Sequence, residues 1–468
     1  MLRRWSRSAI VSLGLVFALV GTAIALVTYS WSTAAVVGGT NQFATWMNST
    51  HATAYTIDKT VTPAVTYTHN VYVSDYALDG TYTNDTKCAA GDCLANYYVR
   101  STNGGKTWTN PVKVPAPANT PTDRGTLAAA GKTVLVAYVD QTSYYSGGGS
   151  TFDVMAPRTA WWSRNTNHGT GAWSAQKKLP GQSASSRVDY LNAWMSGTTV
   201  HIVTTDVDTG AIWYWRSTDK GATFAQPVVI GGTTFLDMKP ISEGGYVGGY
   251  SGLPMVAASG TDVAASWVDD PSGKVVTAVS TNGGVTWSTE TTLVASGGAD
   301  NAGQVQMDAR DSRIAVTWTT AAGGWLKIWN ATTDSWGADH QFVSFPDTDP
   351  GVGTVYNKGG ENAVVALGPG SVVGIALSEC NQLASGAICS DNLTNNKTRE
   401  QLVWRTSDDY GATWSDPQVI GPVTSDKTTF INNYGDAIYI KSKPLALWNG
   451  HDAVYFNYLN YRKIGTPA

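Results

Sequence analysis

Carboxylates with catalytic potential gather just before several short apolar runs of the chain. The sequence holds only five glutamates, and Glu243 and Glu361 both fall in such clusters. Two carboxylates placed on either side of a glycosidic bond can hydrolyse it, one as acid and the other as base or nucleophile. The carboxylates that we consider for such a pair are Asp189, Glu243, Glu361 and Asp436.

Other side chains in these clusters and in the loops are suited to ligand binding. Tyrosine has an apolar ring with a polar tip, so it can stack on a sugar ring and also donate a hydrogen bond. The candidate ligand-binding residues are Asp123, Asp189, Tyr190, Asp436, Tyr144 and Tyr145.

No motif in the sequence demands a metal or another cofactor. Asp206-x-Asp208-x-Gly210 and Asp269-Asp270 offer oxygen ligands that Ca²⁺ prefers. Short Asp-rich turns are more often simple turns, so Ca²⁺ is possible but no site is preferred and no metal ligand is assigned. The nucleotide-binding, zinc-protease and G-x-S-x-G motifs are absent.

The elements that must position these residues are defined by an internal repeat with the pattern S-x-[DN]-x-G-x-T-[WF]. Four copies begin at Ser101, Ser217, Ser280 and Ser407, each between two β-rich runs. Ser, Asp and Asn side chains can close a tight turn onto the backbone, and Gly adopts angles that a Cβ forbids. The motif therefore predicts a structural turn in a hairpin. Its residues are Ser101, Asn103, Gly105 and Trp108; Ser217, Asp219, Gly221 and Phe224; Ser280, Asn282, Gly284 and Trp287; and Ser407, Asp409, Gly411 and Trp414.

This repeat resembles the Asp-box, or BNR repeat, of sialidase-like β-propellers. Asn103 and Asn282 stand where that family usually has Asp, and Phe224 replaces Trp. The resemblance spans about residues 40 to 465 and implies an all-β propeller. Its blades would have four antiparallel strands, A to D from the centre outward, with the Asp-box between C and D.

Strand-like pairs before each turn give the number of blades. Two weaker turns, near Ser163 and Asn330, bring the total to six units of four strands. The first unit is expected to begin with Ala64–Thr68 and Asn70–Asp75. A further pair remains at Pro444–Trp448 and Asp452–Leu459, and Gln42–Met47 and Ala54–Lys59 could complete its blade. We therefore favour seven blades closed by N- and C-terminal strands, with six blades as the alternative.

The face opposite the Asp-boxes is the expected ligand face. It carries the D–A and B–C loops, and three B–C loops are long: residues 75–94, 141–158 and 379–399. Long loops on a regular scaffold are usually functional or disordered. Blades six, seven, one and two are consecutive, so these loops would form a wall on one side of the central channel.

The sequence leaves catalysis open. The family's enzymes need three arginines to hold a sugar carboxylate and a tyrosine nucleophile with a glutamate, but no R-I-P motif occurs here. The candidates are Arg124, Arg187, Glu243, Tyr250, Tyr356 and Glu361. The favoured function is binding of a glycan or protein. The alternatives are a secreted glycoside hydrolase (an exo-sialidase or another glycosidase) and a structural subunit of a surface layer or filament.

The N-terminal 35 residues predict export. Arg3, Arg4 and Arg7 precede an uncharged, mostly apolar stretch from Ala9 to Val27, as in a signal peptide or a membrane anchor. Residues 1–35 are therefore expected to form this segment, with an apolar helix, and residues 36–468 a single propeller outside the cell. Charged residues make up 14% and the net charge is −4, so nucleic acid is not an expected partner.

Other features are compatible with an exported protein. Four cysteines form two close pairs, which predicts the disulfides Cys88–Cys93 and Cys380–Cys389. Possible glycosylation sequons begin at Asn48, Asn84, Asn330, Asn392 and Asn396.

Overall fold

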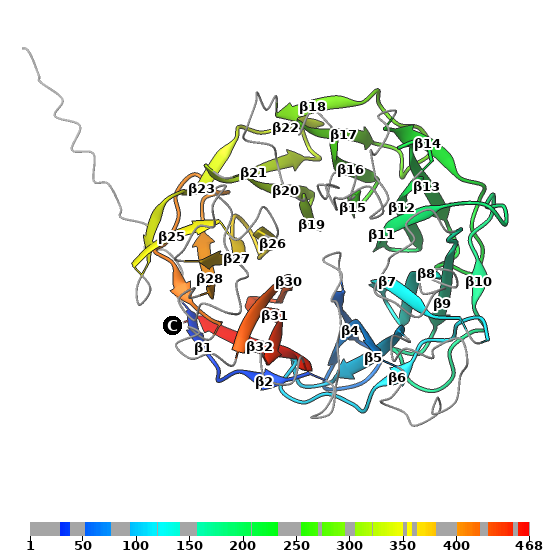
Figure 1. Cartoon of the computed structure of the whole chain (residues 1–468), viewed down its shortest axis with the longest axis horizontal. Coiled ribbons are helices and arrows are strands. Elements are labelled where there is room, and N and C mark those ends of the chain that lie inside the picture. Colours follow the sequence, from blue (N-terminus) through cyan, green and yellow to red (C-terminus); the bar gives the residue numbers. More distant parts are fainter. Residues whose placement is uncertain are drawn as a thin grey trace, which may run out of the picture.

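Seven β-sheets stand around a central axis in the computed structural model (Figure 1). The structure describes residues 29–37, 52–75, 94–118, 120–140, 157–206, 208–232, 254–269, 274–294, 305–320, 322–349, 353–357, 363–380, 400–421, 429–452 and 457–467. The predicted seven-bladed propeller is confirmed, and the six-bladed alternative is wrong. The expected N-terminal apolar helix lies outside the described residues. Within those residues, no helix is long and apolar enough to cross a membrane.

Each blade consists of antiparallel strands in the order A to D. Blades one to four are β3 (Thr53–Asp58), β4 (Val65–Asp75), β5 (Leu94–Ser101) and β6 (Val112–Lys113); β7 (Thr122–Ala130), β8 (Thr133–Asp140), β9 (Ala160–Asn165) and β10 (Lys177–Lys178); β11 (Val188–Ser196), β12 (Thr199–Asp206), β13 (Ile212–Ser217) and β14 (Val228–Gly231); and β15 (Met255–Ser259), β16 (Asp262–Asp269), β17 (Lys274–Ser280) and β18 (Thr291–Val294).

Blades five and six carry additional short strands. Blade five is β19 (Gln306–Arg310), β20 (Arg313–Thr320), β21 (Gly323–Asn330) and β22 (Ser335–Trp336), with β23 (His340–Ser344) also paired to β21. Blade six is β26 (Ala363–Leu367), β27 (Val373–Cys380), β28 (Glu400–Ser407) and β29 (Gln418–Val419), joined by β24 (Asp347–Asp349) and β25 (Gly353–Asn357).

Blade seven closes the ring with strands from both ends of the chain. Its strands are β30 (Thr429–Ile440), β31 (Lys443–Asp452), β32 (Asn457–Pro467) and, outermost, β1 (Tyr29–Trp31), while β2 (Ala35–Val36) also pairs with β32. Closure of this kind leaves no exposed sheet edge at the junction.

The prediction of which N-terminal strands complete blade seven was wrong. Ala54–Lys59 belongs to blade one, where β3 is the innermost strand and pairs with β4. Gln42–Met47 lies outside the described residues. The closing strand starts at Tyr29, within the segment that we expected to precede the propeller, because its aromatic side chains pack on blades six and seven.

Blade one also differs from its prediction. Residues Val65–Asp75 form one continuous strand rather than two, because Asn70 stays in the ladder and its side chain donates to the Thr53 hydroxyl at 2.9 Å. The reversal lies instead at residues 59–64, where the Asp58 carboxylate accepts hydrogen bonds from the Thr60 backbone N–H at 2.9 Å and the Thr60 hydroxyl at 2.6 Å. These bonds form a local Asx turn.

The middle strands of the blades form the core between neighbouring sheets. In β8, every residue from Val134 to Val139 has 0% of its surface exposed. A short continuous apolar run is typical of a strand covered on both faces. The D strands are short and more exposed, as expected for the outer rim.

The Asp-boxes form the predicted turns between strands C and D. The Ser217 hydroxyl donates to the Asp219 carboxylate at 2.7 Å and accepts from the Gly221 N–H at 2.8 Å. The Asp219 carboxylate in turn accepts from the backbone N–H and hydroxyl of Thr223. The same Ser contacts recur at Ser101, Ser280 and Ser407.

The aromatic residue that follows each turn packs against the preceding blade. Phe224 lies edge-on to Trp162 of blade two, with ring centroids 4.9 Å apart, and Trp287 meets Tyr214 of blade three at 4.8 Å. Trp414 contacts Phe342 of blade five at 5.8 Å. The repeat therefore fixes the contact between blades as well as the hairpin.

Candidate functional site

The described part of the ligand face is built around a buried ion pair. Arg158 ends the B–C connection of blade two, and its Nη1 lies 2.8 Å from Asp189 Oδ2. Their side chains are 2% and 3% exposed. The Arg158 backbone is fixed by a hydrogen bond to the Ser186 carbonyl at 2.8 Å and by a parallel bridge to Arg187. This pair therefore ties blade two to the start of blade three.

Arg187 is paired with a carboxylate as well. Its guanidinium contacts Asp208 Oδ1, and its side chain is 19% exposed. The neighbouring Asp206 carboxylate accepts the Asp208 N–H at 3.2 Å and the Thr209 hydroxyl at 2.7 Å. The first Asp-rich turn is thus closed by its own chain and by Arg187.

Three inner strands contain a β-bulge near the end that lies at the ligand face. The register shifts between Asp123 and Thr126 in β7, between Asp189 and Asn192 in β11, and between Asn432 and Gly435 in β30. Bulges of this kind commonly turn a side chain toward a site. At the β11 bulge Tyr190 has φ 55° and its N–H donates to Asp189 Oδ1 at 2.9 Å.

Asp140, at the end of β8, is the centre of a further cluster of hydrogen bonds. Its carboxylate accepts hydrogen bonds from the Thr159 N–H at 2.9 Å, the Thr159 hydroxyl at 2.6 Å and Trp161 Nε1 at 2.9 Å. The carboxylate thereby holds the return of the chain after the B–C connection of blade two.

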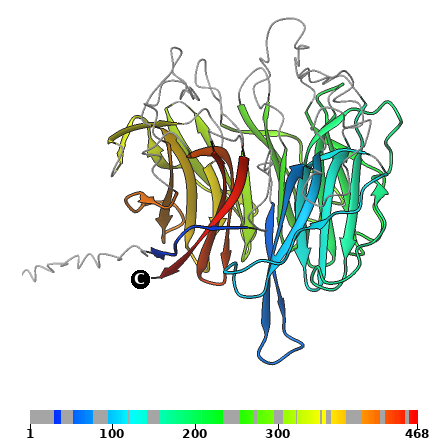
Figure 2. The same ribbon diagram turned by 60° about the horizontal axis from the view of Figure 1, so that its bottom comes forward.

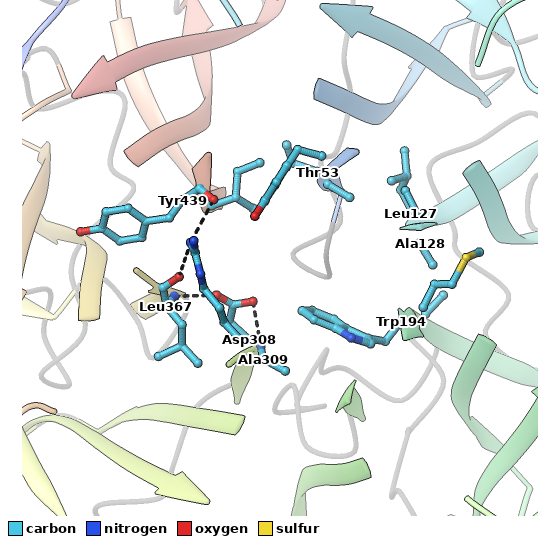
Figure 3. A pocket seen from close by; sticks show the side chains of 15 residues that line it. Thr53, Leu127, Ala128, Trp194, Asp308, Ala309, Leu367 and Tyr439 are labelled. Carbon is cyan, nitrogen blue, oxygen red and sulfur yellow. Dashed lines mark hydrogen bonds between the residues drawn. The ribbon is translucent and has the colours of Figure 1, made fainter. Parts of the chain in front are cut away.

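A small cavity of about 140 Å³ lies on the central axis, among the inner strands (Figure 3). Most of its lining residues lie near one end of the inner strands, the end that leads into the A–B turn. Ala129 in β7 and Met195 in β11 are examples. These turns share a face with the Asp-boxes. In Figure 3, Trp194 extends toward Asp308 and Ala309.

The charged residues of this cavity are bonded to the protein. Burial raises the pKa of Asp308 to about 6, although its carboxylate accepts the N–H groups of Leu367 at 2.6 Å and Ala309 at 2.8 Å. Arg310 Nη1 donates to the carbonyls of Leu367 at 3.3 Å and Tyr439 at 3.5 Å. The cavity therefore has mostly apolar walls, both aliphatic and aromatic, and its charged side chains are engaged.

Asp436 lies between blades seven and one and is 5% exposed. Burial raises its pKa to about 7, while hydrogen bonds with Thr53 and the Ala437 N–H oppose that rise. Its predicted ligand role stays a prediction.

The structure places the remaining predicted residues as follows. Asp123 is buried, at 5% exposed, in β7. Arg124 in β7, Tyr356 in β25 and Cys380 in β27 are described only in their backbone, and Asn330 is exposed at the end of β21. Glu243, Tyr250, Glu361, Tyr144, Tyr145, Cys88, Cys93, Cys389, Asn48, Asn84, Asn392, Asn396 and Asp270 lie outside the described residues.

The described residues bring together only part of the expected site. Arg187, Asp189 and Tyr190 stand together at the start of blade three. Their partner Arg158 was not predicted as a site residue, and Asp208 was considered only as an oxygen ligand for Ca²⁺. Arg158 was recognisable only as an arginine after Pro157 at the end of a long loop. Among the described residues, no three His, Cys, Asp or Glu side chains are grouped for a metal ion.

Known proteins resemble this chain in structure but not detectably in sequence. No protein-family model and no curated protein sequence matches it. A Hadza microbial sialidase matches with a TM-score of 0.47 and 10% identity over 88% of this chain and 65% of its own. A Trypanosoma rangeli sialidase in complex with the inhibitor DANA matches with a TM-score of 0.44 and 11% identity, over 89% and 55%.

A protein of unknown function from Dyadobacter fermentans DSM 18053 matches with a TM-score of 0.49 and 13% identity, over 94% of this chain and 99% of its own. The chain spans less than two thirds of the two sialidases that it matches. It is thus similar in fold to sialidase propellers at low sequence identity, and no residue role is carried over from them.

Proposed function

We propose that this chain is an exported, non-catalytic propeller that binds a glycan or a surface protein through the face opposite the Asp-boxes. The loops of this face stand on a rigid seven-bladed scaffold, which is a usual arrangement for binding surfaces. The Asp-box face, in contrast, uses the polar groups of its repeated motif to close its own turns.

One observation carries the preference for binding over sialidase activity. Two arginines at this end of the channel have side chains that the structure describes, Arg158 and Arg187, and both are already paired with carboxylates of the chain. A sugar carboxylate at Arg158 would have to displace Asp189 and leave that buried charge without its partner, which is strongly unfavourable. A sialidase needs arginines that are open to the substrate.

The experiment that tests this proposal compares hydrolysis and binding by the full chain. A fluorogenic sialoside is offered to the wild type and to Arg124→Ala, and both proteins are screened on a glycan array and against surface proteins. We expect no turnover by the wild type. A ligand found in the screen should bind Arg124→Ala more weakly, and Asp416→Ala, a change in an exposed turn of blade six, should leave binding unchanged.

Two outcomes would contradict the proposal. Turnover by the wild type that is lost in Arg124→Ala would establish the glycoside hydrolase alternative and place one carboxylate-binding arginine. Ligand binding that is abolished by Asp416→Ala and not by Arg124→Ala would move the binding surface away from the loop face.

A further inference from the structure

The pairing of β1 determines the end of the ring from which the N-terminal segment leaves. Tyr29 is opposite Pro467 and Trp31 is opposite Gly465, so β1 runs antiparallel to the last strand. β32 starts after the B–C loop of blade seven and therefore ends at the Asp-box face. Tyr29 is consequently at that face, and the apolar stretch Ala9–Val27 ends only two residues before it.

A basic groove lies beside this exit point. It has a volume of about 990 Å³ and lies between blades seven and one, where Trp31, Pro63 and Leu445 provide apolar walls. Lys106, Lys441 and Lys443 also line it, and all three are exposed.

The exposed lysines of the Asp-box face gather on one side of the ring, whereas Asp311 on the other side is paired with Arg310. Blades seven, one and two carry the exposed lysines of this face, and blades five and six carry exposed or half-exposed aspartates. The lysines are Lys441, Lys443, Lys59, Lys106 and Lys132, and the aspartates are Asp311, Asp334, Asp408 and Asp416. The basic half is the half from which the N-terminal segment leaves.

The hairpin between β3 and β4 projects beyond this basic half. Its strands extend below the ring in Figure 2, and β1 and the C-terminal end lie toward the same face. Residues 59–64 at its tip are exposed, and Val61 is 44% exposed next to Lys59. An apolar tip flanked by a lysine suits the interface of a bilayer, where the aliphatic part is buried and the ammonium group stays in water.

We propose that the Asp-box face is the membrane-proximal face, and that its basic half contacts the phosphates of anionic lipid headgroups. The inference rests on the proposed export and on retention of residues 1–28 as an anchor. Lysines near an anionic membrane surface each strengthen the contact by about fivefold in affinity. The proposed ligand face then points away from the bilayer, toward the surroundings of the cell.

The test uses the full chain in lipid nanodiscs of phosphatidylcholine alone or with phosphatidylglycerol. Hydrogen–deuterium exchange is followed at the hairpin tip, residues 59–64, and in the turn at 441–442, with the blade-four turn at 281–287 as an internal reference. We expect exchange at the tip to be at least about fivefold slower in the anionic discs than in the neutral discs. Exchange in the reference turn should not change.

A matched pair of variants assigns the effect to the groove. Lys441→Glu/Lys443→Glu should remove the protection, whereas Lys178→Glu/Lys274→Glu, with the same charge change away from the groove, should retain it. If the first variant does not fold, added salt should remove the protection in the wild type because it screens these charges. Equal exchange in both lipids, or a purified membrane protein whose mass shows cleavage before Tyr29, would overturn the proposal while leaving the ligand-binding function untouched.

Discussion

At the scale of single residues, the Asp-box tolerates Asn because the closing hydrogen bond can reverse its direction. In blade three the Thr223 hydroxyl donates to Asp219 Oδ2 at 2.6 Å, and in blade one Asn103 Nδ2 donates to the Thr107 hydroxyl at 2.8 Å. In both turns the remaining side-chain oxygen accepts the backbone N–H of the threonine. The replacement of Asp by Asn in the motif therefore preserves the turn.

The serine of the repeat should be harder to replace. In Ser217→Ala the buried Gly221 N–H loses its acceptor, which costs about 1–3 kcal/mol. Urea unfolding should show this loss in the free energy of unfolding. Thr218→Ala, an exposed change in the same turn, should stay within about 0.5 kcal/mol of the wild type. Equal stability of the two variants would show that the serine contact contributes little.

At the scale of elements, the closing strand depends on two aromatic side chains. Trp31 packs edge-on to Trp404, with centroids 5.3 Å apart, and its Nε1 donates to Gln418 at 3.2 Å. Tyr29 and Tyr439 share a hydrogen bond of 3.1 Å between their hydroxyls. The three-residue strand β1 therefore joins blades six and seven.

Truncation tests the role of this strand. A chain that starts at Val36 lacks β1, so it should lose at least about 3 kcal/mol of stability, as for removal of a large buried aromatic side chain. A chain that starts at Tyr29 retains the strand and serves as the control. Thermal unfolding followed by circular dichroism separates the two. The same unfolding temperature for both would contradict a stabilising role for β1.

At the scale of the whole molecule, polar side chains on inner strands link successive blades through backbone hydrogen bonds. The Thr126 hydroxyl accepts the Ala193 N–H at 3.1 Å, and Asn192 Oδ1 accepts the Val256 N–H at 2.8 Å. Asp308 makes the corresponding contact with Leu367. Asp436 of blade seven lies beside Thr53 of blade one across the blade junction.

The buried carboxyl of Asp436 predicts that the free energy of unfolding falls as the pH rises. The pKa of Asp436 is raised to about 7 in the folded state, so the folded chain holds a proton that the unfolded chain releases above its ordinary pKa of about 3.8. The contribution of the bound proton to the free energy of unfolding is complete below pH 3.8 and is lost as the pH rises to and through 7. The total loss is about 1.4 kcal/mol for each unit by which the folded and unfolded pKa values differ.

Asp436→Asn removes this ionisation. Urea unfolding between pH 5 and pH 8 should therefore show a smaller loss of stability in the variant than in the wild type. Asp308, whose pKa is also raised, remains and keeps part of the slope. Asp416→Asn, in an exposed turn, should retain the full wild-type slope; an unchanged slope in Asp436→Asn would contradict the assignment.

The sequence by itself determined the repeated turns, the four-stranded blades and the closure of the ring by both chain ends. These features follow from local hydrogen bonding within a few residues and from runs of apolar side chains, both of which are visible in the sequence.

The tertiary structure alone decided which strands close the ring and what the polar residues contact. β1 has only three residues, and its partners Gln418 and Trp404 are nearly the whole chain away. The pairing of Arg158 with Asp189 joins two blades and lies next to the bulge in β11. Such contacts arise from the packing of separate blades, which no local pattern of residues encodes.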